Sequence, residues 1–186
     1  NLDPAAPADL KETFTMRNIL AACPADKRWP SVAFKVLMQQ FYAEVLRAAH
    51  EIQRVMARKL GEQEHFFTRA HNGENISLRL LYYPAQDKNT VSDGQLGAGA
   101  HTDYGFLTML FQGNVGGLQV LNNEKRWMDV PPEQGAVVVN SGDLLERWTN
   151  GTYRSTLHRV MPRTNGRDRL SIAMFIDPDT ATKVMP

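Results

Sequence analysis

The sequence predicts a mainly β fold, a sandwich or jelly roll, with a long helix packed on its outside. From Ile76 onward the hydrophobic period falls toward two and β-forming residues dominate. Short apolar runs there are separated by Gly, Pro, Asn and Asp turns, whereas the stretch before them repeats at helical spacing. With 186 residues, of which 42% are hydrophobic, the chain can bury the core of one domain.

The first part of the chain predicts an extended segment followed by helices. Residues 1–30 are rich in Ala, Pro and Asp and show no sustained period, so we expect them to cover other parts of the fold. Ser31 is a plausible N-cap of a long amphipathic helix that ends near Gly61. A second, shorter helix is expected over 62–70. The apolar face of the long helix consists of Val32, Val36, Leu37, Phe41, Val45, Leu46, Ala49, Ile52, Val55, Met56 and Leu60.

Strands are expected in the remainder of the chain. The long irregular stretch 84–99 is predicted to be a loop that shapes a binding site, since loops of this length are often functional. The expected strands are 77–82, 106–112, 117–121, 127–130, 136–140, 155–160 and 170–176.

Charge and cysteine content narrow the function classes. The chain has 21 Lys and Arg against 20 Asp and Glu, a net charge of +1, so nothing favours a nucleic-acid partner or an anionic membrane. Apolar runs are far shorter than the roughly 20 residues of a membrane helix, and the start resembles no signal peptide. The single cysteine, Cys23, cannot form an internal disulfide, so we expect a reducing compartment and a cytoplasmic protein. The sequence leaves the oligomeric state open.

A metal site is predicted around His101 and Asp103. These residues stand at i and i+2, on the same face of an extended segment, and His158 of another expected strand can supply a third ligand. Two His and one Asp match the facial triad of non-haem Fe(II), which leaves three coordination positions open. Zinc is the main alternative, although its catalytic sites usually keep one open position. An isolated H-x-D triplet is more often a pair of ordinary polar residues.

Further motifs surround this triplet in a fixed order. Together they resemble the Fe(II)/2-oxoglutarate-dependent oxygenases of the isopenicillin N synthase-like family, especially its bacterial and fungal members. The resemblance implies a double-stranded β-helix (jelly roll, cupin-like) with the long helix outside, and iron ligation by His101, Asp103 and His158. The motifs lie at 97–105, 116–120, 139–143, 148–151, 158–160 and 169–171.

A co-substrate site is expected at Arg169 and Ser171. On a strand these residues point to one side, where a guanidinium and a hydroxyl can bind a carboxylate. The resemblance implies that they hold the distal carboxylate of 2-oxoglutarate, and that Tyr83 of the family's N-Y-Y-P segment contacts the same molecule. Leu81 stands where the family has Asn. The alternative for Arg169 is an ordinary exposed strand arginine.

Aromatic residues are candidates for a substrate pocket. Phe175 lies four residues after Ser171, where the family often places an aromatic residue, and Tyr104 and Phe106 follow the metal triplet. The alternative for each is a place in the core. Beyond the metal ligands no catalytic residue is expected, and Asp143 is interpreted as part of a surface turn.

The resemblance implies a dioxygenase that uses Fe(II), O2 and 2-oxoglutarate, with ascorbate helpful in vitro. It would hydroxylate, desaturate or cyclise a small organic molecule at an unactivated C–H bond and release succinate and CO2. Three alternatives stay open: a relative that oxidises its substrate without 2-oxoglutarate, a non-catalytic binding protein on this fold, and a zinc-dependent lyase or isomerase.

The resemblance also bears on domain organisation. We expect one structural domain in which residues 1–75 are a leading segment with helical support and residues 76–186 are the jelly-roll core. Because members of the family are usually longer, we expect truncation at both ends.

Overall fold

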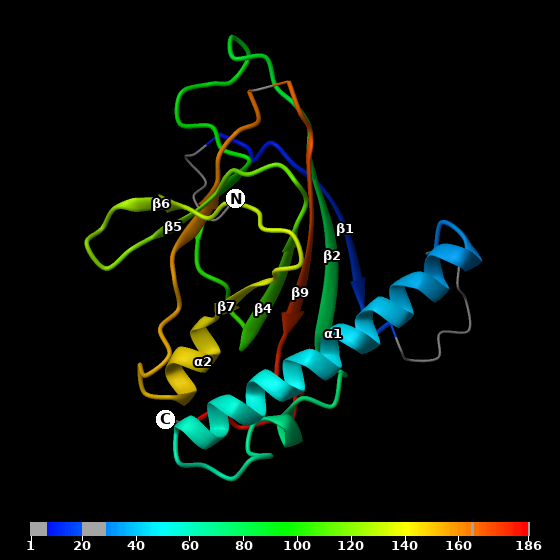
Figure 1. Ribbon diagram of the computed structural model, residues 1–186, viewed down its shortest axis with the longest axis vertical. Coiled ribbons are helices and arrows are strands. Elements are labelled where there is room, and N and C mark those ends of the chain that lie inside the picture. Colours follow the sequence, from blue (N-terminus) through cyan, green and yellow to red (C-terminus); the bar gives the residue numbers. More distant parts are fainter. Residues whose placement is uncertain (1–6, 20–28, 165, 186) are drawn as a thin grey trace.

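Two antiparallel sheets, a long helix and a short α-helix make up the described part of the chain (Figure 1). The computed structural model describes residues 7–19, 29–164 and 166–185, so Cys23 lies outside the described part. One sheet has the order β1-β2-β9-β4-β7 and the other β3-β8-β5-β6. The five strands of the first are β1 Glu12–Arg17, β2 Ile76–Tyr83, β9 Arg169–Ile176, β4 Leu107–Gln112 and β7 Val138–Ser141. The four of the second are β3 Ala98–His101, β8 His158–Val160, β5 Leu118–Leu121 and β6 Trp127–Asp129.

This architecture confirms the predicted jelly roll with an outer helix. Every strand pairing within the two sheets is antiparallel. Apolar side chains of both sheets, such as Leu81 and Leu118, pack together between the inner faces. The outward-facing side chains of the five-stranded sheet, such as Leu78 and Met174, form the main core with the helix. The five-stranded sheet is therefore packed on both faces, against the helix on one side and the four-stranded sheet on the other.

The long helix is α1, Val32–Lys59. The hydroxyl of Ser31 accepts a 3.1 Å hydrogen bond from the amide of Phe34, which confirms the predicted N-cap. The buried face is narrower than predicted, because Val32, Val36, Leu37 and Val55 are exposed. Buried positions recur at steps of three or four up to Met56, with Ala57 beside it, and are Met38, Tyr42, Val45, Ala49, Gln53, Met56 and Ala57. Among the described residues, no helix has the length and apolarity needed to cross a membrane.

The structure corrects four local expectations. Strand β1 lies within the segment expected to lack regular structure, where it pairs with β2 as an edge strand that buries one residue, Met16. The helix expected over 62–70 is wrong, because turns fill this stretch before a short 3₁₀ helix, Thr68–Ala70. The loop expected over 84–99 ends earlier than predicted, because its last two residues belong to strand β3. The turn expected at Asp143 is the start of a helix, α2, Asp143–Trp148.

Candidate metal centre and adjoining cavities

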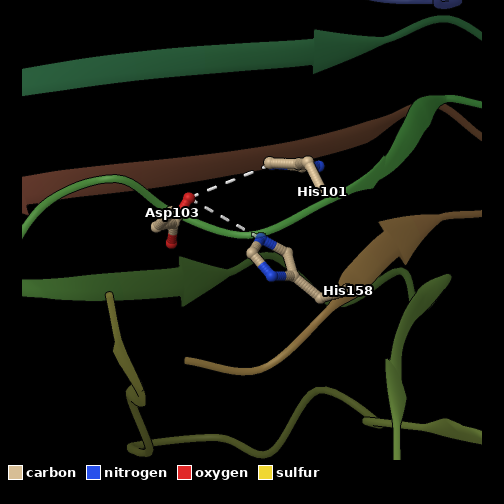
Figure 2. A group of neighbouring side chains, drawn as sticks. All are labelled: His101, Asp103 and His158. Carbon is tan, nitrogen blue, oxygen red and sulfur yellow. Dashed lines mark ion pairs between the residues drawn. The ribbon is translucent and has the colours of Figure 1, made fainter. Parts of the chain in front are cut away.

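Three side chains converge between the two sheets. His101 ends β3 and His158 begins β8, and the register of these strands pairs the two residues directly. Asp103 follows β3 by two residues. Its Oδ1 lies 3.9 Å from Nε2 of His101 and 3.7 Å from Nε2 of His158 (Figure 2). One ligand atom from each of the three residues lies within 4.8 Å of the others, as the predicted metal site requires.

Hydrogen bonds orient both imidazoles toward this point. Nδ1 of His101 lies 2.7 Å from the carbonyl oxygen of Gly99, and Nδ1 of His158 lies 2.9 Å from that of Thr156. A carbonyl oxygen only accepts, so Nδ1 carries the proton in each ring and Nε2 keeps its lone pair. Burial lowers the pKa of His101, and the nearby His158 ring lowers it further, which favours the neutral form that binds a metal.

The carboxylate of Asp103 is held by two neighbours. Its Oδ2 accepts hydrogen bonds from the hydroxyl of Thr108 at 2.7 Å and from the side-chain amide of Asn140 at 2.8 Å. Thr108 and Asn140 face each other across β4 and β7. Because both donors bind the same oxygen, Oδ1 is left to face the two histidines.

Helix α2 positions the loop that carries Asp103. The amide of Asp143 donates a 2.8 Å hydrogen bond to the carbonyl of Asp103, and the amide of Gly142 donates one of 3.0 Å to the carbonyl of Phe106. A Cβ atom on Gly142 would lie 2.1 Å from the carbonyl oxygen of Gly105, so only glycine permits this approach. The carboxylate of Asp143 also accepts a 3.2 Å hydrogen bond from the hydroxyl of Thr102, so backbone and side chain both hold this loop, a role that sequence reasoning missed.

Two imidazole nitrogens and one carboxylate oxygen form a donor set that fits Fe(II). The three ligands come from the four-stranded sheet and the loop after β3, and the remaining side of this point opens into space between the sheets. We call this space the inner cavity. It has a volume of about 290 Å³ and extends from the triad to Arg169. A metal held here would keep coordination positions on the cavity side.

Arg169 lies at the far end of the inner cavity. Its side chain is 1% exposed, and no carboxylate among the described residues forms an ion pair with it. Its terminal nitrogens donate hydrogen bonds to Oγ of Ser171 at 3.1 Å and to Oε1 of Gln112 at 3.2 Å. Burial lowers the pKa of Arg169. A buried cation without a counter-charge is costly, so this end of the cavity is suited to an anionic ligand.

Tyr83 and the three candidate substrate residues take different places. Tyr83 is buried, with the guanidinium of Arg169 over its ring at 4.8 Å, and burial raises the pKa of its hydroxyl. Phe175 lines the inner cavity and also a second, more open hollow of about 600 Å³, which we call the outer cavity. Tyr104 is 68% exposed; it lines the outer cavity but not the inner one.

Phe106 corrects a prediction. Its ring is fully buried in the main core and contacts the rings of Phe67, His71 and Trp148. It lines neither cavity, because the chain after Asp103 turns this side chain toward α2 and the outer helix layer. Phe106 therefore supports the loop rather than a substrate.

Sequence reasoning overlooked the residues that support the site. Thr108 and Gln112 were detectable, because they are the polar members of the inward-facing set on the otherwise apolar strand β4. Arg79 of β2, which lines both cavities, was also overlooked.

Comparison with known proteins gives consistent matches. A family model for the 2OG-Fe(II) oxygenase superfamily matches residues 75–178. The 2-oxoglutarate-Fe(II) type oxidoreductase hxnY of Emericella nidulans is 38% identical over 167 residues, 86% of this chain and 48% of that protein. A full-length Neurospora crassa protein in complex with alpha-KG and thymine superposes with a TM-score of 0.86 at 36% identity, covering 96% of this chain and 56% of the other. JOX2 in complex with 2OG, Fe and JA superposes with a TM-score of 0.82 at 29% identity. This match covers 96% of this chain and 53% of the other. The chain thus spans about half the length of the curated relatives it matches.

Proposed function

This chain belongs to the 2OG-Fe(II) oxygenase superfamily, and we propose that it is the catalytic part of an Fe(II)- and 2-oxoglutarate-dependent dioxygenase. The proposed reaction oxidises a C–H bond of a small organic molecule and releases succinate and CO2. One observation carries the proposal: a single cavity has the His101, Asp103 and His158 donors at one end and the buried Arg169 cation at the other. A dicarboxylate that also chelates a metal matches both ends.

Different side chains would bind the metal and the co-substrate. His101, Asp103 and His158 would hold the iron, which when bound supplies the redox chemistry that couples decarboxylation of 2-oxoglutarate to oxidation by O2. Arg169 and Ser171 would bind the distal carboxylate, so that the 2-oxo acid end points toward the metal. The apolar walls between these ends, Leu110 and Val138 among them, exclude water from the reacting groups.

The experiment tests binding before turnover. Metal-free protein is titrated with 2-oxoglutarate under anaerobic conditions, with Fe(II) and without it, and binding is followed by calorimetry. We expect one equivalent of 2-oxoglutarate to bind, more tightly with Fe(II), and succinate to form once O2 and ascorbate are added. Absence of both binding and succinate would refute the proposal.

The same assay with candidate small organic molecules added separates two of the alternatives. Oxidation of a substrate without succinate would indicate a relative that does not use 2-oxoglutarate, and stable metal binding without any turnover would indicate a binding protein. The relatives' names favour neither. A small-molecule substrate is supported by the thymine-bound structure from Neurospora crassa. The absence of a nucleic-acid or membrane partner and the cytoplasmic location stay predictions from charge and cysteine content.

A further inference from the structure

Arg79 is a second arginine that faces the space between the sheets. It lies on β2, where the register places it between Thr15 of β1 and Ala173 of β9. Its Nε donates a 3.1 Å hydrogen bond to the hydroxyl of Thr15. Its guanidinium carbon lies 5.0 Å from the centre of the Phe175 ring. Two contacts therefore fix the guanidinium in place where the inner and outer cavities meet.

The nearby charged groups leave the charge of Arg79 without a counter-ion in the described part of the chain. Lys11, which lines the same two cavities, pairs with Asp9 at 2.8 Å. Asp177 at the outer cavity has Arg17 as its cationic neighbour. Among the described residues, no carboxylate forms an ion pair with Arg79, and none accepts a hydrogen bond from its terminal nitrogens. These nitrogens are available to an anion from solution.

The position of Arg79 distinguishes it from the co-substrate anchor. On β2, Tyr83 pairs with Arg169, and Arg79 lies four residues from Tyr83, which is about 13 Å along the strand at roughly 3.3 Å per residue. Phe175, which stacks with Arg79, pairs instead with Thr108, the residue that holds the carboxylate of Asp103. Arg169 and Arg79 thus serve opposite ends of the inner cavity, and Arg79 lies at the metal end.

We propose that Arg79 binds a carboxylate, or a group of equal acidity, on the molecule that is oxidised. The proposal rests on the dioxygenase function proposed above and specifies its substrate class as a small organic anion. The guanidinium would bind the acidic group through its terminal nitrogens, while Phe175 packs against the apolar part of the molecule. A bound substrate would then be anchored at the junction of the cavities, with its remaining atoms directed toward the triad.

The test compares two probes of equal shape and different charge. Benzoate and benzamide are titrated by calorimetry into the full chain loaded with Zn(II), which does not react, and saturated with 2-oxoglutarate, which occupies Arg169. We expect benzoate to bind about ten-fold or more tightly than benzamide, because a hydrogen-bonded ion pair adds more than a neutral contact. Arg79→Met should bring this ratio to about one. Arg47→Met, which alters an exposed arginine of α1, should leave it unchanged.

The outcomes separate this proposal from the proposed function. If 2-oxoglutarate does not bind the unaltered protein, the dioxygenase function fails and this proposal fails with it. If 2-oxoglutarate binds but both probes bind equally, or Arg79→Met keeps the preference, the substrate class alone is overturned. Benzoate binding that occurs without 2-oxoglutarate and is absent at saturating 2-oxoglutarate would place the anion at Arg169 and also overturn it. If Arg79→Met does not fold by thermal melting, Arg79→Gln replaces it and should likewise abolish the preference.

Discussion

Thr108 donates a 2.7 Å hydrogen bond to Oδ2 of Asp103, and this bond sets the direction of the candidate metal ligand. Both residues are buried, so the bond is shielded from competing water. With Asn140 on the same oxygen, Asp103 has one free carboxylate oxygen, and it faces His101 and His158. The geometry of the site therefore depends on a strand residue outside the ligand set.

Thr108→Val is expected to weaken metal binding while the fold persists. Valine has nearly the shape of threonine but cannot donate to Asp103, and removal of such a supporting partner typically costs about 10- to 100-fold in metal affinity. Calorimetric titration of metal-free protein with Mn(II) measures the change. Thr13→Val alters an exposed threonine of β1 and should bind the metal as the unaltered protein does. Equal affinities in both variants would refute the positioning role of Thr108.

Arg169→Met is expected to reduce the stabilisation of the protein by 2-oxoglutarate. Loss of hydrogen bonds from a charged group to a carboxylate costs about 2 kcal/mol, which is about a thirty-fold loss in affinity. Without ligand, the variant should be as stable as the unaltered protein or more so, because a buried cation without a carboxylate partner is removed. Thermal melts with and without 2-oxoglutarate measure both effects. An undiminished rise of the melting temperature with 2-oxoglutarate would contradict this assignment.

Gly142→Ala is expected to destabilise the protein and to weaken the metal site. Its Cβ would lie 2.1 Å from the carbonyl oxygen of Gly105, so helix α2 must move away from the loop that carries Asp103. Such overpacking costs about 1–3 kcal/mol. Gly116→Ala is the matched control, since its Cβ would come no nearer than 3.5 Å to another atom. Urea unfolding and Mn(II) titration of both variants test this, and a fully tolerated Gly142→Ala would show that the loop position is not constrained.

Residue patterns predicted the sheet strands and the long helix because period and turn chemistry are local properties. The predicted metal ligands come together because the register of β3 with β8 pairs His101 and His158. The pattern failed where structure depends on distant contacts. Strand β1 buries one side chain and is recognisable only through its pairing with β2. Helix α2 has six residues, too few for a period to appear.

The functional site was less predictable than the ligands themselves. Phe106 follows the metal triplet closely and yet points into the core, because sequence distance does not give side-chain direction across an irregular loop. Arg79 was overlooked because it lies in a regular strand, far in sequence from the metal triplet. An arginine in an alternating strand is usually solvent-exposed, and its significance appears only once Phe175 and both cavities are placed around it.

His71 is expected to make stability fall at acidic pH. Its ring is fully buried, and burial lowers its pKa to about 4 from the ordinary 6.5. Between these values the unfolded chain binds a proton that the folded protein does not, so stability decreases as pH falls below 6.5. By pH 5 the loss from this residue is about 2 kcal/mol.

His71→Phe should remove this part of the pH dependence, at a cost of about 1 kcal/mol at about pH 7.5 for the lost hydrogen bond to the carbonyl of Phe67. Urea unfolding at pH 7.5 and pH 5 measures both effects. His65→Phe, at an exposed position, should keep the pH dependence of the unaltered protein, and an equal slope in His71→Phe would contradict the assignment.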